Sequence, residues 1–397
     1  MRLYDEEKLK NDVAANSGRP YRQCSISVMD TIADPNISFD DKGICNYYYE
    51  YLQKEKWFIP AKEEAAEKLG AIVAQIRKDG EGKKYDCITG ISGGVDSTYL
   101  CLQAKKLGLR PLIVHFDNGW NSELAVKNIE NIITKLGFDL YTLVVDWNEF
   151  RDMQLAYLKA SVVDIEALTD HAIAATLFKL AAENNIRHIL SGYNIVTEGV
   201  LPSYWVFNKS DDVNIRAIHK KYGTIPLKSY PFFGLKERKM LSGIKGIDTI
   251  NLLNFLPYNK KEVKNIIANE LGWRDYGGKH YESVFTRFYQ GYILPVKFGI
   301  DKRKAHLSNL IFSGQITKDE ALEELKKPII DKQQLQDDYE FVLKKFNLTA
   351  AAFETILLQP RHEHTEFATV QNIYNKYPIL SILKPFVKVA RKLGMKI

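Results

Sequence analysis

The chain has 397 residues, 45% of them hydrophobic and 26% charged, and its formal net charge at pH 7 is +6. This is the composition of a globular protein of two or three domains, and the modest charge suits anionic small molecules at least as well as nucleic acid. No apolar stretch reaches bilayer-spanning length, and the first residues lack a signal-peptide core. We therefore expect a cytoplasmic protein without an integral membrane segment.

Helix and strand patterns alternate along the middle of the chain, after an N-terminal segment of residues 1–60. Strands are expected over 85–91, 111–116, 140–145 and 187–192, and helices over 65–78, from Ser97 as N-cap onward, over 121–135 and over 164–184. This alternation predicts an α/β fold in which a parallel sheet is covered by helices on both faces.

From about residue 235 onward the pattern changes to charged helical segments, such as 260–271 and 318–327. We therefore expect an α/β domain over 61–235 and a mostly helical domain over 236–397, which would contact the substrate or a partner. The basic stretch 384–396 is interpreted as a solvated terminal helix, with a membrane-facing helix as the alternative. The stretch 361–364, with its two histidines, is interpreted as surface.

A glycine-rich loop from Ser92 to Ser97 (SGGVDS) joins the strand at 85–91 to the next helix. Free N–H groups at a helix start attract phosphate oxygens, and glycines let the backbone approach them. Asp96 beside a polyanion requires an intervening cation, so we assign this carboxylate to Mg²⁺. The loop lacks the Walker lysine, which argues against transfer of the terminal phosphoryl group. The alternative is an ordinary glycine-rich turn before a helix.

Ligands of parallel α/β sheets bind beyond the carboxyl ends of the strands. In this chain those ends carry polar and aromatic residues, as a nucleotide pocket requires. The residues that we predict to bind ATP are Ser92, Gly93, Gly94, Asp96, Ser97, Thr98, His115, Phe116, Asp117 and Gly192.

The loop resembles that of the PP-loop ATP pyrophosphatases. Further stretches follow in a specific order along nearly the whole chain: 28–31 (VMDT), 43–46 (GICN), 115–120 (HFDNGW), 169–171 (TDH), 197–199 (TEG), 277–280 (GGKH), 282–283 (ES), 297–303 (KFGIDKR) and 306–308 (HLS). Together they resemble one PP-loop family, the N-acetyl sugar amidotransferases of bacterial surface-glycan biosynthesis, of the LPS O-antigen and pseudaminic-acid type.

The resemblance implies an adenine nucleotide alpha hydrolase-like fold and an AMP-forming amidotransferase. In this reaction the acetamido oxygen of an N-acetyl sugar attacks the α-phosphorus of ATP, and pyrophosphate leaves on the loop. Ammonia then displaces AMP to give an acetamidino sugar. Asp96 would act through Mg²⁺, and Lys279 and Arg303 are candidate cations for the leaving pyrophosphate.

Three further positions keep two interpretations each. His280 is a candidate for moving a proton of the incoming amine, although a lone histidine is more often structural. Glu198 is either a ligand of a second Mg²⁺ or a surface residue. Asp170 and His171 are either a capping aspartate with a packed histidine or functional groups, and as sequence neighbours they point in different directions.

Members of the resembling family carry two cysteine pairs suited to Zn²⁺, but this chain departs from that pattern. Cys24 is followed by Ser27, and Cys45 by Tyr48, where the second cysteines are expected. Two thiolates cannot close a structural zinc site, so we predict no bound zinc. Cys87 and Cys101 fall in a predicted strand and helix and are interpreted as core residues, without a disulfide framework.

Ammonia at neutral pH is mostly ammonium, and Cys87 and Cys101 lack the exposed setting of a glutaminase nucleophile. The resemblance therefore implies two separate partners, a glutaminase subunit and an ammonia-channelling synthase subunit, and no nucleic acid. The alternatives are a PP-loop tRNA-modifying enzyme, which would need a cysteine pair or a dense basic surface, and a catalytically silent ATP-binding scaffold of a glycan-synthesis complex.

Overall fold

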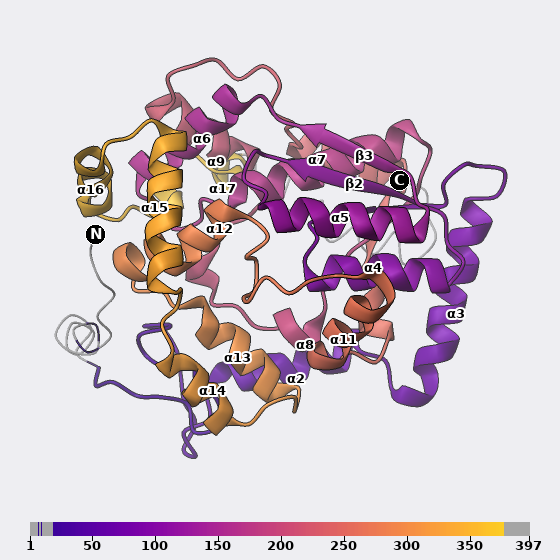
Figure 1. Ribbon diagram of the computed structural model, residues 1–397, viewed down its shortest axis with the longest axis horizontal. Helices are drawn as coiled ribbons and strands as arrows, with labels where there is room; N and C mark the ends of the chain where they lie inside the picture. Colours follow the sequence, from indigo (N-terminus) through magenta and orange to yellow (C-terminus); the bar gives the residue numbers. More distant parts are fainter. Residues whose placement is uncertain (1–6, 8, 10–18, 377–397) are drawn as a thin grey trace.

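The computed structural model of the chain describes residues 7, 9 and 19–376 (Figure 1). Its centre is a five-stranded sheet whose strands are all parallel and follow the order β3-β2-β1-β4-β5. Because the winding direction changes between β3 and β4, the carboxyl ends of β1 and β4 meet at a topological switch point. The strands are β1 (Cys87–Gly90), β2 (Pro111–Asp117), β3 (Leu140–Val144), β4 (His188–Leu190) and β5 (Asp248–Ile250).

Helices cover both faces of the sheet, and Figure 1 shows α5 alongside β2 and α4 alongside α5. Successive side chains of a strand point to opposite faces, so Ile113 and Leu112 of β2 enter two different hydrophobic clusters. The first cluster packs the sheet against α3 (Lys62–Asp79), α4 (Val95–Lys106), α5 (Glu123–Leu136) and α11 (Lys260–Leu271). The second packs it against α7 (Ala167–Glu183). The predicted fold class is confirmed.

Two details differ from the prediction. α4 begins at Val95 with Gly94 as its N-cap, so the expectation that Ser97 caps this helix is wrong. β5 is absent from the predicted elements, and it pairs with β4. The sheet therefore continues past residue 235, where we place the end of the α/β domain. The division of the chain into segments 1–60, 61–235 and 236–397 otherwise stays a prediction.

The remaining elements lie between the strands and after the sheet. Between β3 and β5 the chain also forms α6 (Trp147–Ala160), α8 (Ile195–Glu198), η1 (Ser203–Trp205), α9 (Asp212–Tyr222), α10 (Leu235–Arg238) and the π-helical η2 (Lys239–Ile244). After β5 come η3 (Leu252–Phe255), α12 (Val284–Phe288), the π-helical η4 (Tyr289–Phe298), α13 (Lys302–Phe312), α14 (Lys318–Lys326), α15 (Lys332–Phe346), α16 (Ala350–Leu358), η5 (His364–Glu366) and α17 (Val370–Lys376). The described region after β5 is thus helical, as expected.

Within the described residues, no helix has both the length and the apolar character needed to cross a membrane. The basic stretch 384–396, which we interpret as a terminal helix, lies outside the described residues.

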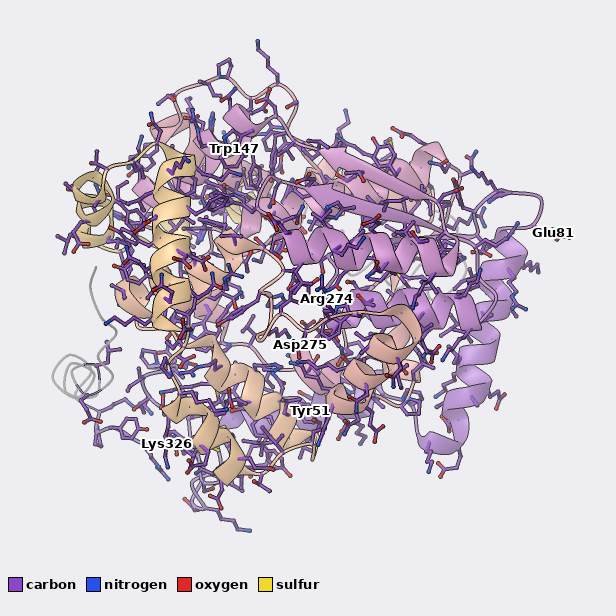
Figure 2. All side chains as sticks on the ribbon, in the orientation of Figure 1. Tyr51, Glu81, Trp147, Arg274, Asp275 and Lys326 are labelled. Carbon is purple, nitrogen blue, oxygen red and sulfur yellow. The ribbon has the colours of Figure 1, made fainter. Side chains whose placement is uncertain are left out.

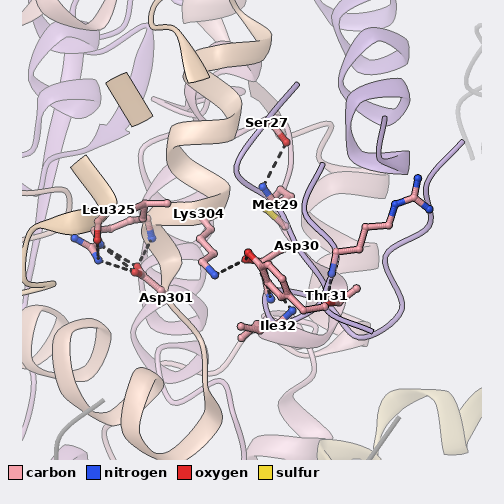
Figure 3. Close-up of polar contacts among 12 residues, drawn as sticks. Ser27, Met29, Asp30, Thr31, Ile32, Asp301, Lys304 and Leu325 are labelled. Carbon is pink, nitrogen blue, oxygen red and sulfur yellow. Dashed lines mark hydrogen bonds and ion pairs between the residues drawn. The ribbon is translucent and has the colours of Figure 1, made fainter. Parts of the chain in front are cut away.

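The N-terminal segment, which ends in α2 (Asn46–Phe58), is tied to the C-terminal helices by a buried ion pair (Figure 3). Asp30 accepts hydrogen bonds from the N–H groups of Ile32 and Ala33. Its other carboxylate oxygen lies 2.5 Å from Nζ of Lys304 in α13, and both side chains are at most 3% exposed. The VMDT stretch therefore has a structural role, because its aspartate anchors this segment.

His364 is buried, so the interpretation of stretch 361–364 as surface is wrong at this residue. Its ring stacks on Phe207 with centroids 4.4 Å apart, and its Nδ1 lies 2.8 Å from Oδ1 of Asn214. Burial lowers the pKa of His364 to about 3, which keeps the ring neutral. His362 instead pairs with Glu366 at 2.8 Å on the surface. The two histidines consequently face different environments.

Candidate functional site

The loop from Ser92 to Ser97 folds on itself at the carboxyl end of β1, the central strand. Oγ of Ser97 donates to the carbonyl of Gly94 at 3.2 Å, and the two serine hydroxyls lie 3.3 Å apart. The N–H of Gly94 donates to Oγ of Ser92 at 3.2 Å. The loop leads directly into the first turn of α4, where N–H groups lack acceptors within the helix. An anion at this point meets the positive end of the helix dipole.

Gly93 is the position at which this loop requires glycine. Its φ is +80°, and a Cβ there would lie 2.8 Å from the hydroxyl of Tyr276. The carbonyl of Gly93 accepts hydrogen bonds from Nε1 of Trp273 at 2.7 Å and from the Tyr276 hydroxyl at 2.9 Å. Both rings belong to the segment between α11 and α12, which runs along α5 where Figure 2 labels Arg274 and Asp275. This segment therefore fixes the loop conformation from outside.

Two carboxylates and a lysine lie beside the loop. Oδ1 of Asp96 accepts hydrogen bonds from Nδ2 of Asn194 at 3.2 Å and from the hydroxyl of Tyr258. Burial raises the pKa of Asp96, and the nearby charge of Glu198 raises it further. Nζ of Lys279 lies 2.8 Å from Oε1 of Glu198, and this ion pair lowers the pKa of Glu198 although burial opposes it. The two carboxylates thus repel each other, and only one has a direct cationic partner here.

Lys260 and His306 complete a group that we call the charged cluster, which consists of Asp96, Glu198, Lys260, Lys279 and His306. Nζ of Lys260 lies 2.6 Å from Nε2 of His306. Burial, together with the charge of Lys279, lowers the pKa of Lys260 to about 7. Burial and both lysines lower the pKa of His306 well below its ordinary value, so the ring is neutral and accepts the hydrogen bond. Sequence reasoning missed Lys260 and gave His306 no role, since nothing in the sequence links either residue to the loop.

A pocket of about 310 Å³ also borders the loop. Its apolar wall comes from the ends of β1 and β2 and from α7, and includes Val114, Phe116, Ile173 and Leu177. Its polar wall includes Ser92, Ser97, His115, Glu166, Asp170 and Glu282. A hollow of this size, with an apolar wall and a few convergent polar groups, is typical of a small-molecule site.

The last three residues of β2, His115 to Asp117, lie in two places, the pocket and the turn that follows the strand. His115 and Phe116 line the pocket. The His115 ring is held by the carbonyl of Ile91, 3.1 Å from Nδ1, and by Nδ2 of Asn121, 3.1 Å from Nε2. Asp117 does not line the pocket, and its carboxylate accepts a hydrogen bond from Nδ2 of Asn121 at 3.1 Å. Asp117 therefore shapes the turn, although we expect it to bind ATP from the sequence.

Two other residues that we predict to bind ATP, Thr98 and Gly192, lie where they support the packing around the loop. Thr98 is fully buried within α4. Gly192 packs on the start of α4, where an added Cβ would lie 3.3 Å from backbone atoms of Asp96 and Ser97. Its missing side chain allows the end of β4 to approach the loop closely.

Lys279 and His280 come from one segment but enter two different places. His280 has a φ of +63°, in the left-handed region that non-glycine residues seldom occupy. It lines the pocket, and its Nδ1 lies 3.7 Å from Oε1 of Glu282. Lys279 lies in the charged cluster. The left-handed backbone thus occurs where one side chain, Lys279, enters the charged cluster and the next, His280, enters the pocket.

Arg303 is not brought together with the loop. Its guanidinium pairs with Asp301 at 2.8 Å and donates to the carbonyl of Lys327 at 2.8 Å, at the end of α14. The structure therefore places Arg303 where it stabilises a helix end, away from the group formed by Asp96, Glu198 and Lys279.

Asp170 and His171 point in different directions, as their spacing predicts. Asp170 lines the pocket and pairs with Lys209 at 3.1 Å. His171 is buried, with Nδ1 2.8 Å from the carbonyl of Lys209 and Nε2 accepting the N–H of Phe233 at 3.0 Å. Burial lowers the pKa of His171. The histidine has the structural role, and the aspartate faces the pocket.

Asp96 and Glu198 fit a Mg²⁺ ion that is bound jointly with phosphate. In the part of the chain that is described, no group of three or more His, Cys, Asp or Glu side chains forms a metal cage. Mg²⁺ commonly uses only one or two carboxylates and completes its shell with water and phosphate oxygens. A cation between Asp96 and Glu198 would relieve the repulsion that raises the pKa of Asp96.

The cysteines of the N-terminal segment lie together without the expected partners. The N–H of Cys45 donates to Sγ of Cys24 at 3.3 Å, and Oγ of Ser27 lies 3.9 Å from Sγ of Cys45. Hydrogen bonding from Cys45, against burial, lowers the pKa of Cys24. Both thiols are fully buried.

The absence of zinc stays a prediction with a direct test. We expect metal analysis of the purified protein to find well below one zinc ion per chain, because Cys24 and Cys45 supply only two thiolates. A matched Ser27→Cys, Tyr48→Cys variant should gain zinc. One zinc per unmodified chain would contradict the prediction.

The start of the C-terminal region is joined to the carboxyl edge of the sheet. The N–H of Ser122 donates to the carbonyl of Glu282 at 2.9 Å, and the N–H of Val284 donates to the carbonyl of Trp120 at 2.8 Å. Residues 282–381 match the family described as LPS biosynthesis protein WbpG-like, C-terminal domain. This stretch of the chain is therefore similar to a WbpG-like C-terminal domain. This WbpG-like domain contributes Glu282 and Thr286 to the pocket beside the loop.

One relative and two solved structures are also similar to parts of the chain. The chain is 25% identical over 319 residues to an uncharacterized protein of Methanocaldococcus jannaschii, a match that covers 78% of this chain and 95% of the relative. It is similar to NMN synthetase from Francisella tularensis, with 13% identity, a TM-score of 0.32 and coverage of 76% of this chain and 100% of that chain. It is also similar to an ammonia-dependent NAD synthetase from Campylobacter jejuni, with 14% identity, a TM-score of 0.28 and coverage of 41% and 73%.

Proposed function

We propose that the protein is an ATP-dependent amidotransferase of surface-glycan biosynthesis, which converts the acetamido group of an N-acetyl sugar into an acetamidino group and releases AMP and pyrophosphate. The observation that carries this proposal is the loop from Ser92 to Ser97, flanked by the charged cluster and by a small-molecule pocket. The WbpG-like domain, which is a domain of LPS biosynthesis proteins, supports a glycan acceptor.

The charged cluster supports cleavage of ATP between the α and β phosphates. The loop and the start of α4 offer N–H groups for pyrophosphate, and Lys279 and Lys260 lie beside them. Positive charge held where a leaving group develops negative charge lowers the barrier to its departure. The apolar wall of the pocket, next to Phe116, suits the adenine ring.

Asp96 and Glu198 are the residues that would hold Mg²⁺, and the ion would supply neutralisation of phosphate charge. Lys279 would then be free to turn from Glu198 towards the pyrophosphate. An amide oxygen is a poor leaving group, and linkage to AMP makes it a good one, so the chain's residues need mainly to position the reactants. The nitrogen would come from separate glutaminase and synthase subunits, and from ammonium in solution when these subunits are absent.

The proposal is tested by incubating the protein with ATP, Mg²⁺, ammonium chloride and either UDP-N-acetylglucosamine, UDP-N-acetylgalactosamine or free N-acetylhexosamines. We expect acceptor-dependent AMP and pyrophosphate, and a product in which NH replaces one oxygen. Glutamine as the sole nitrogen source should give no turnover with this chain alone. Formation of ADP would overturn the mechanism. ATP binding without any AMP would favour the silent scaffold.

Pyrophosphate binding should be linked to proton uptake through Lys260. The lysine has a pKa of about 7 in the free protein, so it is mostly neutral at pH 8, and a bound polyanion favours its charged form. We expect calorimetry of Mg²⁺-pyrophosphate binding at pH 8, in buffers of different ionisation enthalpy, to show uptake of up to about one proton more than in Lys260→Met. Lys261→Met, an exposed neighbour, is the matched control. Equal uptake in all three proteins would exclude Lys260 from the pyrophosphate site.

A further inference from the structure

The polar end of the pocket is acidic. Glu166, at the start of α7, and Glu282, at the start of the WbpG-like domain, line the same pocket as Ser92 and Ser97. Among the described residues that line it there is no lysine or arginine. The part of the wall that Glu166 and Glu282 form therefore suits a neutral or cationic reactant beside the phosphate-binding loop.

Glu166 has surroundings that favour exchange of a proton. Its Oε2 accepts a hydrogen bond from Oγ1 of Thr286 at 2.9 Å. Burial, reinforced by the charge of Asp170 and opposed by Lys209 and Lys302, raises the pKa of Glu166 to about 7. The charge of Asp170 is itself paired with Lys209 at 3.1 Å. Near neutral pH the Glu166 carboxyl group is therefore available both as an acceptor and as a donor of a proton.

Each of the other titratable groups of the pocket is engaged by a neighbouring group, as Asp170 is by Lys209. His280 and Glu282 face the pocket as a pair with 3.7 Å between Nδ1 and Oε1. His115 is held at both ring nitrogens by Ile91 and Asn121. Glu166, in contrast, has a neutral hydroxyl as its hydrogen-bond partner.

We propose that Glu166 is the catalytic base that takes a proton from an ammonium ion in this pocket and so generates the ammonia that attacks the adenylated acceptor. This inference rests on the proposed function and adds to it the residue that activates the nucleophile. Neither its spacing nor its neighbours in the sequence single out Glu166. The geometry does so, because its carboxylate shares one pocket with the loop on which the adenylate would form.

The proposed step uses one ammonium ion and one adenylated acceptor. One proton passes from ammonium to the Glu166 carboxylate, and the freed lone pair of nitrogen forms a bond to the imidate carbon. The bond from that carbon to the AMP oxygen breaks, and its electron pair stays on the phosphate. A second proton of the former ammonium passes to the departing phosphate, which leaves an amidinium product. Protonated Glu166 returns its proton to solvent when the products leave.

Ammonium and hydroxylamine distinguish a base from a merely structural residue, since hydroxylamine is already neutral at pH 7. With an acceptor that the wild-type chain adenylates, Glu166→Gln should lower kcat/KM for ammonium at pH 7 by about 100- to 10,000-fold and largely retain turnover with hydroxylamine. The defect with ammonium should shrink towards pH 9, where more of the reagent is neutral ammonia. Glu166→Asp should restore part of the activity. Glu183→Gln, at an exposed position at the end of the same helix, is the matched control.

A stability measurement checks the protonation of Glu166 without any acceptor. The folded pKa lies above the ordinary value of 4.5, so the wild type should lose stability relative to Glu166→Gln as the pH rises from 4.5 to about 7. A difference in Tm that is independent of pH would overturn the assignment. Equal loss with both nucleophiles, or full ammonium activity in Glu166→Gln, would overturn it as well. Failure of the wild type itself to form AMP with every acceptor would instead overturn the proposed function, and this step with it.

Discussion

Replacement of Asp96 by asparagine is expected to lower AMP formation by about 100- to 1,000-fold while the protein stays folded. Asparagine can still accept the hydrogen bonds from Tyr258 and Asn194, but it offers Mg²⁺ no charge. Burial raises the pKa of Asp96 in the folded state, so ionised Asp96 costs stability above its ordinary pKa of 3.8. Asp96→Asn should therefore unfold at the same Tm or a higher one at pH 7.

The measurement pairs pyrophosphate release with thermal unfolding of the same samples. Asp248→Asn, at the exposed start of β5, is the matched control and should change neither quantity. Loss of activity together with a lowered Tm would mean that Asp96 mainly supports the fold. Full AMP formation in Asp96→Asn would remove Asp96 from the reaction.

Replacement of Lys304 by methionine is expected to destabilise the chain by about 3–5 kcal/mol, because it leaves Asp30 buried and unpaired. The two groups are 2.5 Å apart, and Figure 3 shows them at the contact between α13 and the N-terminal segment. Urea unfolding at pH 7 measures the change. Lys68→Met breaks an exposed pair with Glu64, which water and salt screen, so this control variant should unfold at nearly the same urea concentration as the wild type.

A double replacement separates the lost pair from the lost packing. The cost of Asp30→Asn with Lys304→Met should be smaller than the sum of the two single costs, because the double variant leaves no unpaired buried charge. Additive costs would mean that the two side chains contribute independently. In that case the hydrogen bonds that Asp30 accepts from Ile32 and Ala33 would account for its importance.

The parts of the fold that local pattern controls are predictable from the sequence. Apolar runs predicted β1 to β4, and helical periodicity predicted most of the helices around these strands. The helical segment expected over 260–271 is α11 (Lys260–Leu271). β5 has three residues and two of them are exposed, so it carries no apolar run to recognise. Its place in the sheet is decided by pairing with β4, which is a tertiary contact.

The candidate site divides in the same way. The loop from Ser92 to Ser97 consists of contiguous residues, so its glycines, serines and aspartate can be recognised in the sequence. Lys260, His306 and Glu166 come from separate helices, and only packing places Lys260 against His306 and Glu166 against Thr286. The stretch KFGIDKRKAHLS shows the difference well, since its charged residues look alike in sequence. In the folded chain Arg303 contacts the end of α14, and Lys304 pairs with Asp30. His306 lies in the charged cluster, next to Lys260.

The sequence by itself determined the fold class, the position of the loop and the family that the chain resembles, because these depend on periodicity and on contiguous residues. The tertiary structure alone decided which charged groups share the loop. It joined the WbpG-like domain to the edge of the sheet, buried Lys260 next to Lys279, and enclosed Glu166 in the pocket. The physical reason is that pKa values and ion pairs depend on burial and on distances through space, which separation along the chain does not encode.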